Sequence, residues 1–150
     1  MIDFTALTAI QSSIQNDLDI ESLKTRSVLQ HYFDASCKAD LDAVMEDFTE
    51  QLVLVTEDAS FIGLKAIRNF YTSLLQLFSK GFVSYKLKKV AVVKDIAYIT
   101  WQLKTSEFEI PFGTDTFIIR NEKILYQTGG AYTIPSEQNT ENVRATNNAL

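Results

Sequence analysis

The chain has 150 residues, 46% of them hydrophobic, with a formal net charge of −5, and this length suits one globular domain that buries roughly two-thirds of its unfolded surface. The acidic balance argues against binding to nucleic acid, which depends on clustered Lys and Arg, and the one basic run, Lys86, Lys88 and Lys89, is typical of a solvated strand face. A single cysteine allows no internal disulfide. The N-terminus does not resemble a signal peptide and no apolar stretch reaches 18 residues, so we expect a cytoplasmic protein that does not enter a membrane.

Helical patterns fill the first half of the chain. Residues 1–20 form an N-terminal extension, in which apolar residues at three- and four-residue spacing from 4 to 18 predict a weak amphipathic helix. A clearer helix is predicted for residues 21–38. Its inward stripe includes Tyr32, while His31 lies on its flank and is interpreted as a partly exposed residue.

Two further helices are predicted on either side of a short strand. Asp40 precedes apolar residues at helical spacing that run to Phe48, and it is therefore a typical N-cap for a short helix. Residues 51–56 predict a strand. The strongest helical pattern covers residues 64–78, and Gly81 is expected to be its left-handed cap.

From residue 82 the hydrophobic period changes from 3.6 to 2, which indicates strands. Strands are predicted at 82–93 and 96–104, and the segment 109–132 predicts two more, joined by a turn at Asn121 and Glu122. The short turns make this run antiparallel, because parallel neighbours need long crossovers. Helices followed by an antiparallel run predict an α+β fold.

The predicted strands have bulky residues on both faces. In the strand at 96–104, for example, Trp101 points to one face and Tyr98 to the other. Helices can cover only one face of the sheet, so we expect the other face to pair with a second copy of the chain in a homodimer. Residues 21–134 are interpreted as one domain. The polar composition of residues 135–150 predicts a disordered tail.

Asp115 is the most informative polar residue, because it shares a strand face with Phe117 and Ile119. Such an acid either lies in an apolar pocket, where its pKa rises and it can donate a hydrogen bond, or is solvated after the preceding turn. Spacing alone favours neither alternative. Tyr32 on an inward helix stripe and Trp101 on a strand are both typical of a core.

Several kinds of site are excluded by residue counts. One His and one Cys cannot supply the three or four ligands that zinc prefers. No Gly-rich phosphate loop follows a strand, and Gly129 and Gly130 instead indicate a bulge or close packing. We therefore expect neither a metal nor a cofactor.

Several short segments together resemble a known group of proteins. They are Tyr32, Ala-Asp-Leu-Asp-Ala at 39–43, Phe48, Gly-Leu-Lys-Ala-Ile-Arg-Asn-Phe-Tyr at 63–71, and Asp-Thr-Phe-Ile-Ile-Arg-Asn-Glu-Lys-Ile at 115–124. In this order, over about residues 22–134, the chain is similar to the nuclear-transport-factor-2-like (NTF2-like) superfamily, and within it to the SnoaL-like and ketosteroid-isomerase-like proteins. The resemblance implies a cone in which a curved antiparallel sheet wraps around the N-terminal helices, as in cystatin-like α+β folds. It also implies an apolar pocket at the wide end and dimers that pair through the sheet.

The resemblance also implies a site. Ketosteroid isomerase uses a Tyr and a protonated Asp as an oxyanion hole and a second Asp as base. The first two positions match Tyr32 and Asp115, whereas the base position falls at Thr56, which cannot abstract a carbon-bound proton, and strand periodicity turns Glu57 to the other face. We expect the pocket to be lined by Thr56, Phe117, Ile119, Trp101 and Phe48. The implied function is the binding of a small apolar ligand with a carbonyl or hydroxyl, with isomerase, cyclase or dehydratase chemistry that needs no cofactor. A non-catalytic ligand-binding or dimerisation module stays open as the alternative.

Overall fold

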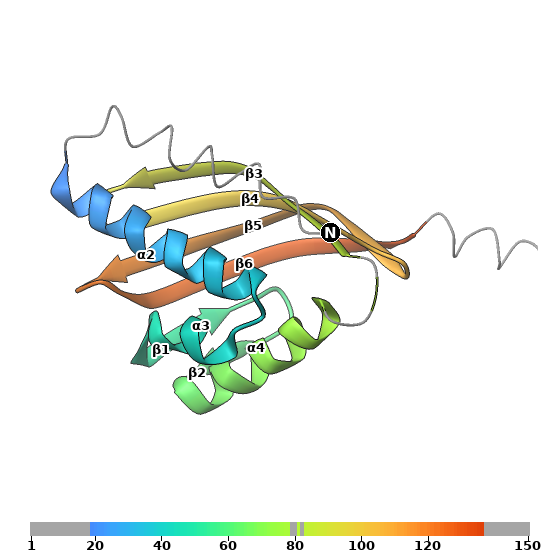
Figure 1. The fold of residues 1–150 in the computed structure, drawn as a ribbon, viewed down its shortest axis with the longest axis horizontal. Coiled ribbons are helices and arrows are strands. Elements are labelled where there is room, and N and C mark those ends of the chain that lie inside the picture. The colour runs from blue at the N-terminus through green and yellow to red at the C-terminus, as the bar shows by residue number, and fades with distance from the viewer. Residues whose placement is uncertain (1–18, 79–80, 82, 137–150) are drawn as a thin grey trace, which may run out of the picture.

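The computed structural model describes residues 19–78, 81 and 83–136, and Figure 1 shows their arrangement. Its elements are, in chain order, α2 (Ile20–Cys37), α3 (Leu41–Glu46), β1 (Phe48–Val55), β2 (Ser60–Ile62), α4 (Leu64–Phe78), β3 (Val83–Val93), β4 (Ile96–Thr105), β5 (Phe108–Arg120) and β6 (Lys123–Pro135). The predicted α+β fold is confirmed. The helix expected at 4–18 lies outside the described residues, and Pro135, assigned to the tail, instead ends β6.

The six strands form one open, curved sheet in the order β2-β1-β6-β5-β4-β3. Neighbouring strands are antiparallel except β1 and β6, which run parallel, so the sheet is mixed and not the purely antiparallel one expected. α4 and four strands separate β1 from β6 along the chain, which gives the long connection that parallel pairing requires. Register shifts within the β3–β4, β4–β5 and β5–β6 pairs bend the long strands. The sheet therefore curves around the helices (Figure 1).

The local signals at turns and caps were mostly predictable. Asn121 and Glu122 have φ angles of 52° and 60°, as the tight turn between β5 and β6 requires. The Asp40 carboxylate accepts a hydrogen bond from the Ala43 amide at 3.1 Å, which confirms the predicted N-cap. The prediction that Gly81 forms a left-handed cap was wrong. Gly81 lies beyond the end of α4, and its φ of 134° is far from the left-handed helical value.

The core lies between the inner face of the sheet and the helices. α2 packs against β3, β4 and β5, while α4 packs against β1 and β2. Tyr32 on α2 makes edge-to-face contacts with Phe33, Phe48, Tyr71 and Phe117, at ring-centroid distances of 5.2 to 6.2 Å. Such contacts between buried rings stabilise the core beyond the burial of their area.

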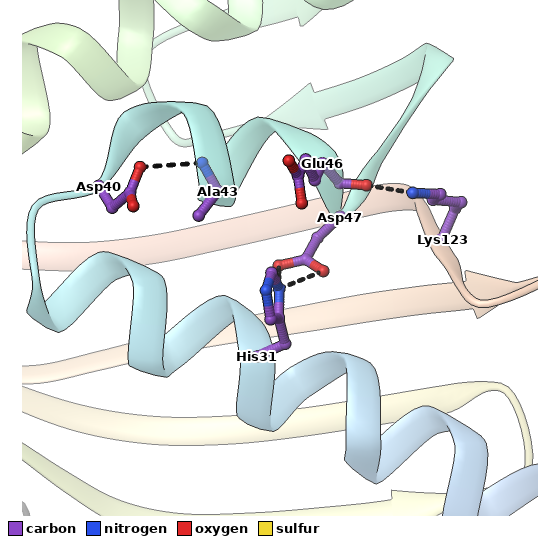
Figure 2. A network of polar contacts seen from close by, with 6 residues as sticks. All are labelled: His31, Asp40, Ala43, Glu46, Asp47 and Lys123. Carbon is purple, nitrogen blue, oxygen red and sulfur yellow. Dashed lines mark hydrogen bonds and ion pairs between the residues drawn. The ribbon is translucent and has the colours of Figure 1, made fainter.

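A polar network fastens α2 to the start of β1 and to the β5–β6 hairpin (Figure 2). His31 Nδ1 lies 2.8 Å from Asp47 Oδ1, and this pairing raises the pKa of His31, while burial raises the pKa of Asp47 although His31 opposes the shift. The Asp47 carbonyl also accepts the Ile124 amide at 2.6 Å, and the Lys123 ammonium donates to the Glu46 carbonyl. The single histidine therefore has a structural partner.

Candidate active site

A cavity of about 320 Å³ lies between α2, α4 and the inner face of the sheet. Residues from α2, α4, the β1–β2 turn and the strands β1, β3, β4, β5 and β6 line it, and most of the surface that they present is apolar. Its aromatic members are Tyr32, Phe33, Phe70, Tyr71, Tyr85, Trp101 and Phe108. A space of this size and character can hold a small apolar molecule.

Asp115 lies in the wall of this cavity, on the inner face of β5 between Ile99 of β4 and Gly129 of β6. Its carboxylate accepts hydrogen bonds from Trp101 Nε1 at 2.6 Å and from Gln127 Nε2 at 3.1 Å. Burial raises the pKa of Asp115 to about 6, although both hydrogen bonds oppose the shift. The group is therefore mostly ionised at pH 7 and able to exchange a proton near neutrality.

Two tyrosines extend these contacts into one hydrogen-bonded chain. Tyr71 Oη donates to Gln127 Oε1 at 2.9 Å, and Tyr32 Oη lies 2.9 Å from Tyr71 Oη. Because Tyr71 has one hydroxyl proton and gives it to Gln127, Tyr32 must be the donor to Tyr71. The donors therefore all point along the chain from Tyr32 towards Asp115. We call Tyr32, Tyr71, Gln127, Asp115 and Trp101 the Asp115 network.

Tyr32 and Asp115, the two predicted catalytic residues, thus line one cavity but are joined through Tyr71 and Gln127. Burial raises the pKa of both Tyr32 and Tyr71, so both hydroxyls keep their protons near neutral pH. The sequence analysis did not single out Tyr71 or Gln127. The available signal was weak: a Tyr on an inward helix stripe, and a Gln at an inward position of a strand.

Two glycines make room for the Asp115 network. A Cβ on Gly113 would lie 2.5 Å from the Trp101 ring, and a Cβ on Gly129 would lie 2.8 Å from Asp115 Oδ1. The close packing predicted for Gly129 is therefore confirmed. At Gly130 the nearest atom to such a Cβ is 4.0 Å away, so no close packing explains that glycine.

The predicted lining residues separate into two groups. Thr56 and Trp101 line the cavity. Phe48, Phe117 and Ile119 do not, because they lie deeper under the helices, in the hydrophobic core, and are 5%, 0% and 4% exposed. Their placement along the cavity is corrected accordingly.

Thr56 and Glu57 both face the cavity, whereas strand periodicity had turned Glu57 away. The reason is that β1 ends at Val55, so the alternation of a strand no longer applies. The Thr56 hydroxyl accepts the Ala59 amide at 3.1 Å and holds the turn. Glu57 accepts the Ala131 amide at 3.3 Å across the cavity mouth.

In the part of the chain that the structure describes, no group of three or more His, Cys, Asp and Glu side chains could hold a metal ion. No helix of that part is long and apolar enough to cross a bilayer.

Residues 29–127 match the family model of the SnoaL-like domain. The chain belongs to the SnoaL-like family. The matched span begins within α2 and ends at Gln127, so it includes all five members of the Asp115 network. None of the curated proteins matches the chain.

Solved structures similar to this SnoaL-like protein have the NTF2-like fold. An NTF2-like protein of unknown function from Mesorhizobium loti is 17% identical with a TM-score of 0.67, and the match covers 77% of this chain and 97% of that one. A putative polyketide cyclase from Sinorhizobium meliloti is 21% identical with a TM-score of 0.59, and the match covers 69% of this chain and 93% of that one. A putative ketosteroid isomerase from Kribbella flavida is 12% identical with a TM-score of 0.64, and the match covers 80% of this chain and 88% of that one. The fold predicted from the resemblance is therefore confirmed.

Proposed function

We propose that this protein binds a small apolar molecule with a carbonyl or hydroxyl group in the cavity, and that Asp115 exchanges a proton with it. The observation that supports this proposal is a carboxyl group in the wall of an apolar cavity, held by two neutral donors, with a pKa of about 6. General acid–base catalysis is most efficient when the pKa of the group is near the working pH. Isomerisation, cyclisation and dehydration without a cofactor all need such a group.

The members of the Asp115 network take different roles in this proposal. Asp115 removes a proton from the ligand as carboxylate and returns it as acid. Trp101 and Gln127 are positioning residues, since they fix both oxygens of the carboxylate. Tyr32 lines the cavity and keeps its proton near neutrality, so it can turn its hydroxyl from Tyr71 to a ligand oxygen and stabilise developing negative charge.

The similar structures support the reaction class only in outline. Two of them are described as a putative polyketide cyclase and a putative ketosteroid isomerase. Thr56 stands at the usual base position of the isomerase pattern and cannot serve as base. The proposal therefore assigns the proton transfer to Asp115 instead.

Ligand binding tests the proposal. A panel of neutral phenols and aromatic ketones is titrated into the protein, and binding is followed by the fluorescence of Trp101, the only tryptophan of the chain. Asp115→Asn and Tyr32→Phe should weaken binding by about 10-fold or more, the expected loss for a hydrogen bond to a charged or buried group. Asp42→Asn on α3 and Tyr126→Phe on β6 are the matched controls, because both residues are exposed and lie outside the cavity lining. Equal binding by the Asp115 variant and its control refutes the assignment.

A second candidate function, a module that dimerises through its sheet, is favoured by one observation on the outer face. An apolar row crosses all six strands through the paired residues Val93, Ile96, Ile118, Tyr126, Val53 and Ile62. Four of these are between 45% and 73% exposed, which is costly in a monomer. Sedimentation equilibrium should give a dimer that Tyr126→Asp dissociates and Lys65→Glu, on the exposed side of α4, does not. A monomeric protein refutes this candidate.

A further inference from the structure

The cavity that the proposed function uses has negatively charged side chains in its described lining and no positively charged ones. Among its described lining residues are three acids, Asp115, Glu57 and Asp58, and none is Lys, Arg or His. Within the described residues, the side-chain donors to the Asp115 carboxylate are Trp101 and Gln127, both of them neutral. A partly buried carboxylate without an opposite charge is unfavourable, and the Glu57 charge adds to the cost. The described lining of the cavity therefore carries negative charge alone, and a cationic ligand can balance it.

The walls beside Asp115 are suited to a cation. The rings of Trp101 and Tyr85 stack with their centroids 5.8 Å apart, and both line the cavity. Trp101 also donates to Asp115 Oδ2, so an aromatic edge and a carboxylate meet at one point. The faces of indole and phenol rings attract ammonium groups, above all where water is excluded. Carboxylate and aromatic rings together offer both of the interactions that bind an organic cation.

We propose that the natural ligand carries, besides its carbonyl or hydroxyl group, a protonated amine on an apolar ring system, and that this ammonium group binds the Asp115 carboxylate beside Trp101 and Tyr85. This inference rests on the proposed function and names the class of its ligand. A volume of about 320 Å³ is at the lower end of small-molecule sites, which suits a bicyclic body. Anionic ligands are disfavoured, because they would face Glu57 and Asp58 as well as Asp115.

The proton on Asp115 controls this preference. Tyr32, Tyr71 and Tyr85 face Asp115 from α2, α4 and β3, and Cys37 of α2 lines the same cavity. Burial raises the pKa of all four, so they stay neutral at neutral pH. Glu57, in the β1–β2 turn, is the charged group whose charge acts on Asp115. Asp115, with a pKa of about 6, is then the group that loses its charge as the pH falls from 8 to 5. Amine binding should weaken by about 10-fold over this interval, since only about one-tenth of the carboxyl is ionised at pH 5.

Three matched probes test the inference: 2-(2-naphthyl)ethylamine, 2-(2-naphthyl)ethanol and 2-naphthylacetate, which are a cation, a neutral molecule and an anion of one body. Isothermal titration calorimetry at pH 8 should show the amine binding at least about 10-fold more tightly than the alcohol, as expected for a charge-assisted bond. The acetate should bind most weakly. The amine's advantage should shrink at pH 5.

Variants distinguish amine binding at this site from a general attraction of the amine to the negatively charged protein. Asp115→Asn should abolish the amine's preference over the alcohol, and an unchanged circular dichroism spectrum shows that the variant is folded. Should this variant not fold, Glu57→Gln at the cavity mouth provides the second test and should reduce the preference about 2-fold, in line with a partly screened charge. Glu122→Gln removes an equal charge from the exposed β5–β6 turn and should leave the preference unchanged.

The outcomes distinguish the two proposals. If the alcohol binds as tightly as the amine at pH 8, the cation inference is overturned and the proposed function stands. If the amine's preference survives in both Asp115→Asn and Glu57→Gln, the assignment to this cavity is overturned. If none of the three probes binds, both proposals fail.

Discussion

Replacing Gly113 by Ala should distort the candidate site, because the new methyl group meets the Trp101 ring. Its Cβ would lie 2.5 Å from two atoms of the indole, where ordinary contacts begin near 3.4 Å. The ring must then retreat by about 1 Å. It is held there by its 2.6 Å hydrogen bond to Asp115 and by its stacking on Tyr85, so the retreat weakens both.

The expected cost is about 1–3 kcal/mol for overpacking, with up to about 1.5 kcal/mol more if the hydrogen bond is lost. Gly130→Ala is the matched control, because its Cβ finds no atom closer than 4.0 Å and neither glycine has a positive φ. That control should be neutral or slightly stabilising, since alanine restricts the unfolded chain.

Urea denaturation followed by Trp101 fluorescence measures both effects, because this single tryptophan also reports its own displacement as a shifted emission maximum. Equal stability of the two variants, with unchanged emission from Gly113→Ala, would show that the indole does not lie over Gly113.

Three further predictions concern titrating and hydrogen-bonded groups. The pKa of Asp115 is raised in the folded protein from 3.8 to about 6, so its contribution to stability is complete well below 3.8 and is lost as the pH rises through 6, by about 3 kcal/mol. The difference in unfolding free energy between the wild type and Asp115→Asn should change by about this amount between about pH 3 and pH 8, and a constant difference contradicts the burial of the charge. The pKa of His31 is raised chiefly by its hydrogen bond to Asp47. The stability that the pair provides is therefore complete below the ordinary pKa of 6.5 and is lost as the pH rises through the raised pKa. In Asp47→Asn the NMR shifts of the His31 ring protons should give a pKa nearer 6.5, and an unchanged pKa contradicts the pairing. Gln127→Leu removes a donor to Asp115, so the pKa of Asp115 should rise further. Tyr71→Phe leaves that donor in place and should instead cost about 1–3 kcal/mol of stability through the unpaired Gln127 oxygen. An unchanged Asp115 pKa in Gln127→Leu refutes the network.

Local signals in the sequence predicted the elements well, because caps, turns and periodicity depend on near neighbours. Asp40 capped its helix, and Asn121 with Glu122 formed the tight turn. The parallel pairing of β1 with β6 was not predictable in this way, since no short connection joins the two strands. Phe48 was assigned to a helix stripe because its spacing fits both elements, but the helix ends at Glu46 and Phe48 begins β1.

The candidate site was predictable only as a strand face. Asp115, Phe117 and Ile119 do lie on one face of β5, yet periodicity does not say how far along the strand the core ends and the cavity begins. That boundary depends on where α2 and α4 cover the sheet. Tyr71 and Gln127 meet across 56 positions of sequence, so no local pattern could indicate their hydrogen bond.

The most direct test of the account is the pKa of Asp115, followed through the NMR shift of its carboxyl carbon against pH and assigned with Asp115→Asn. The account predicts a midpoint near 6, because burial in an apolar cavity outweighs the two hydrogen bonds to the carboxylate. A midpoint near the ordinary value of about 4 would mean a solvated acid and would contradict the proposed role of Asp115 in proton transfer.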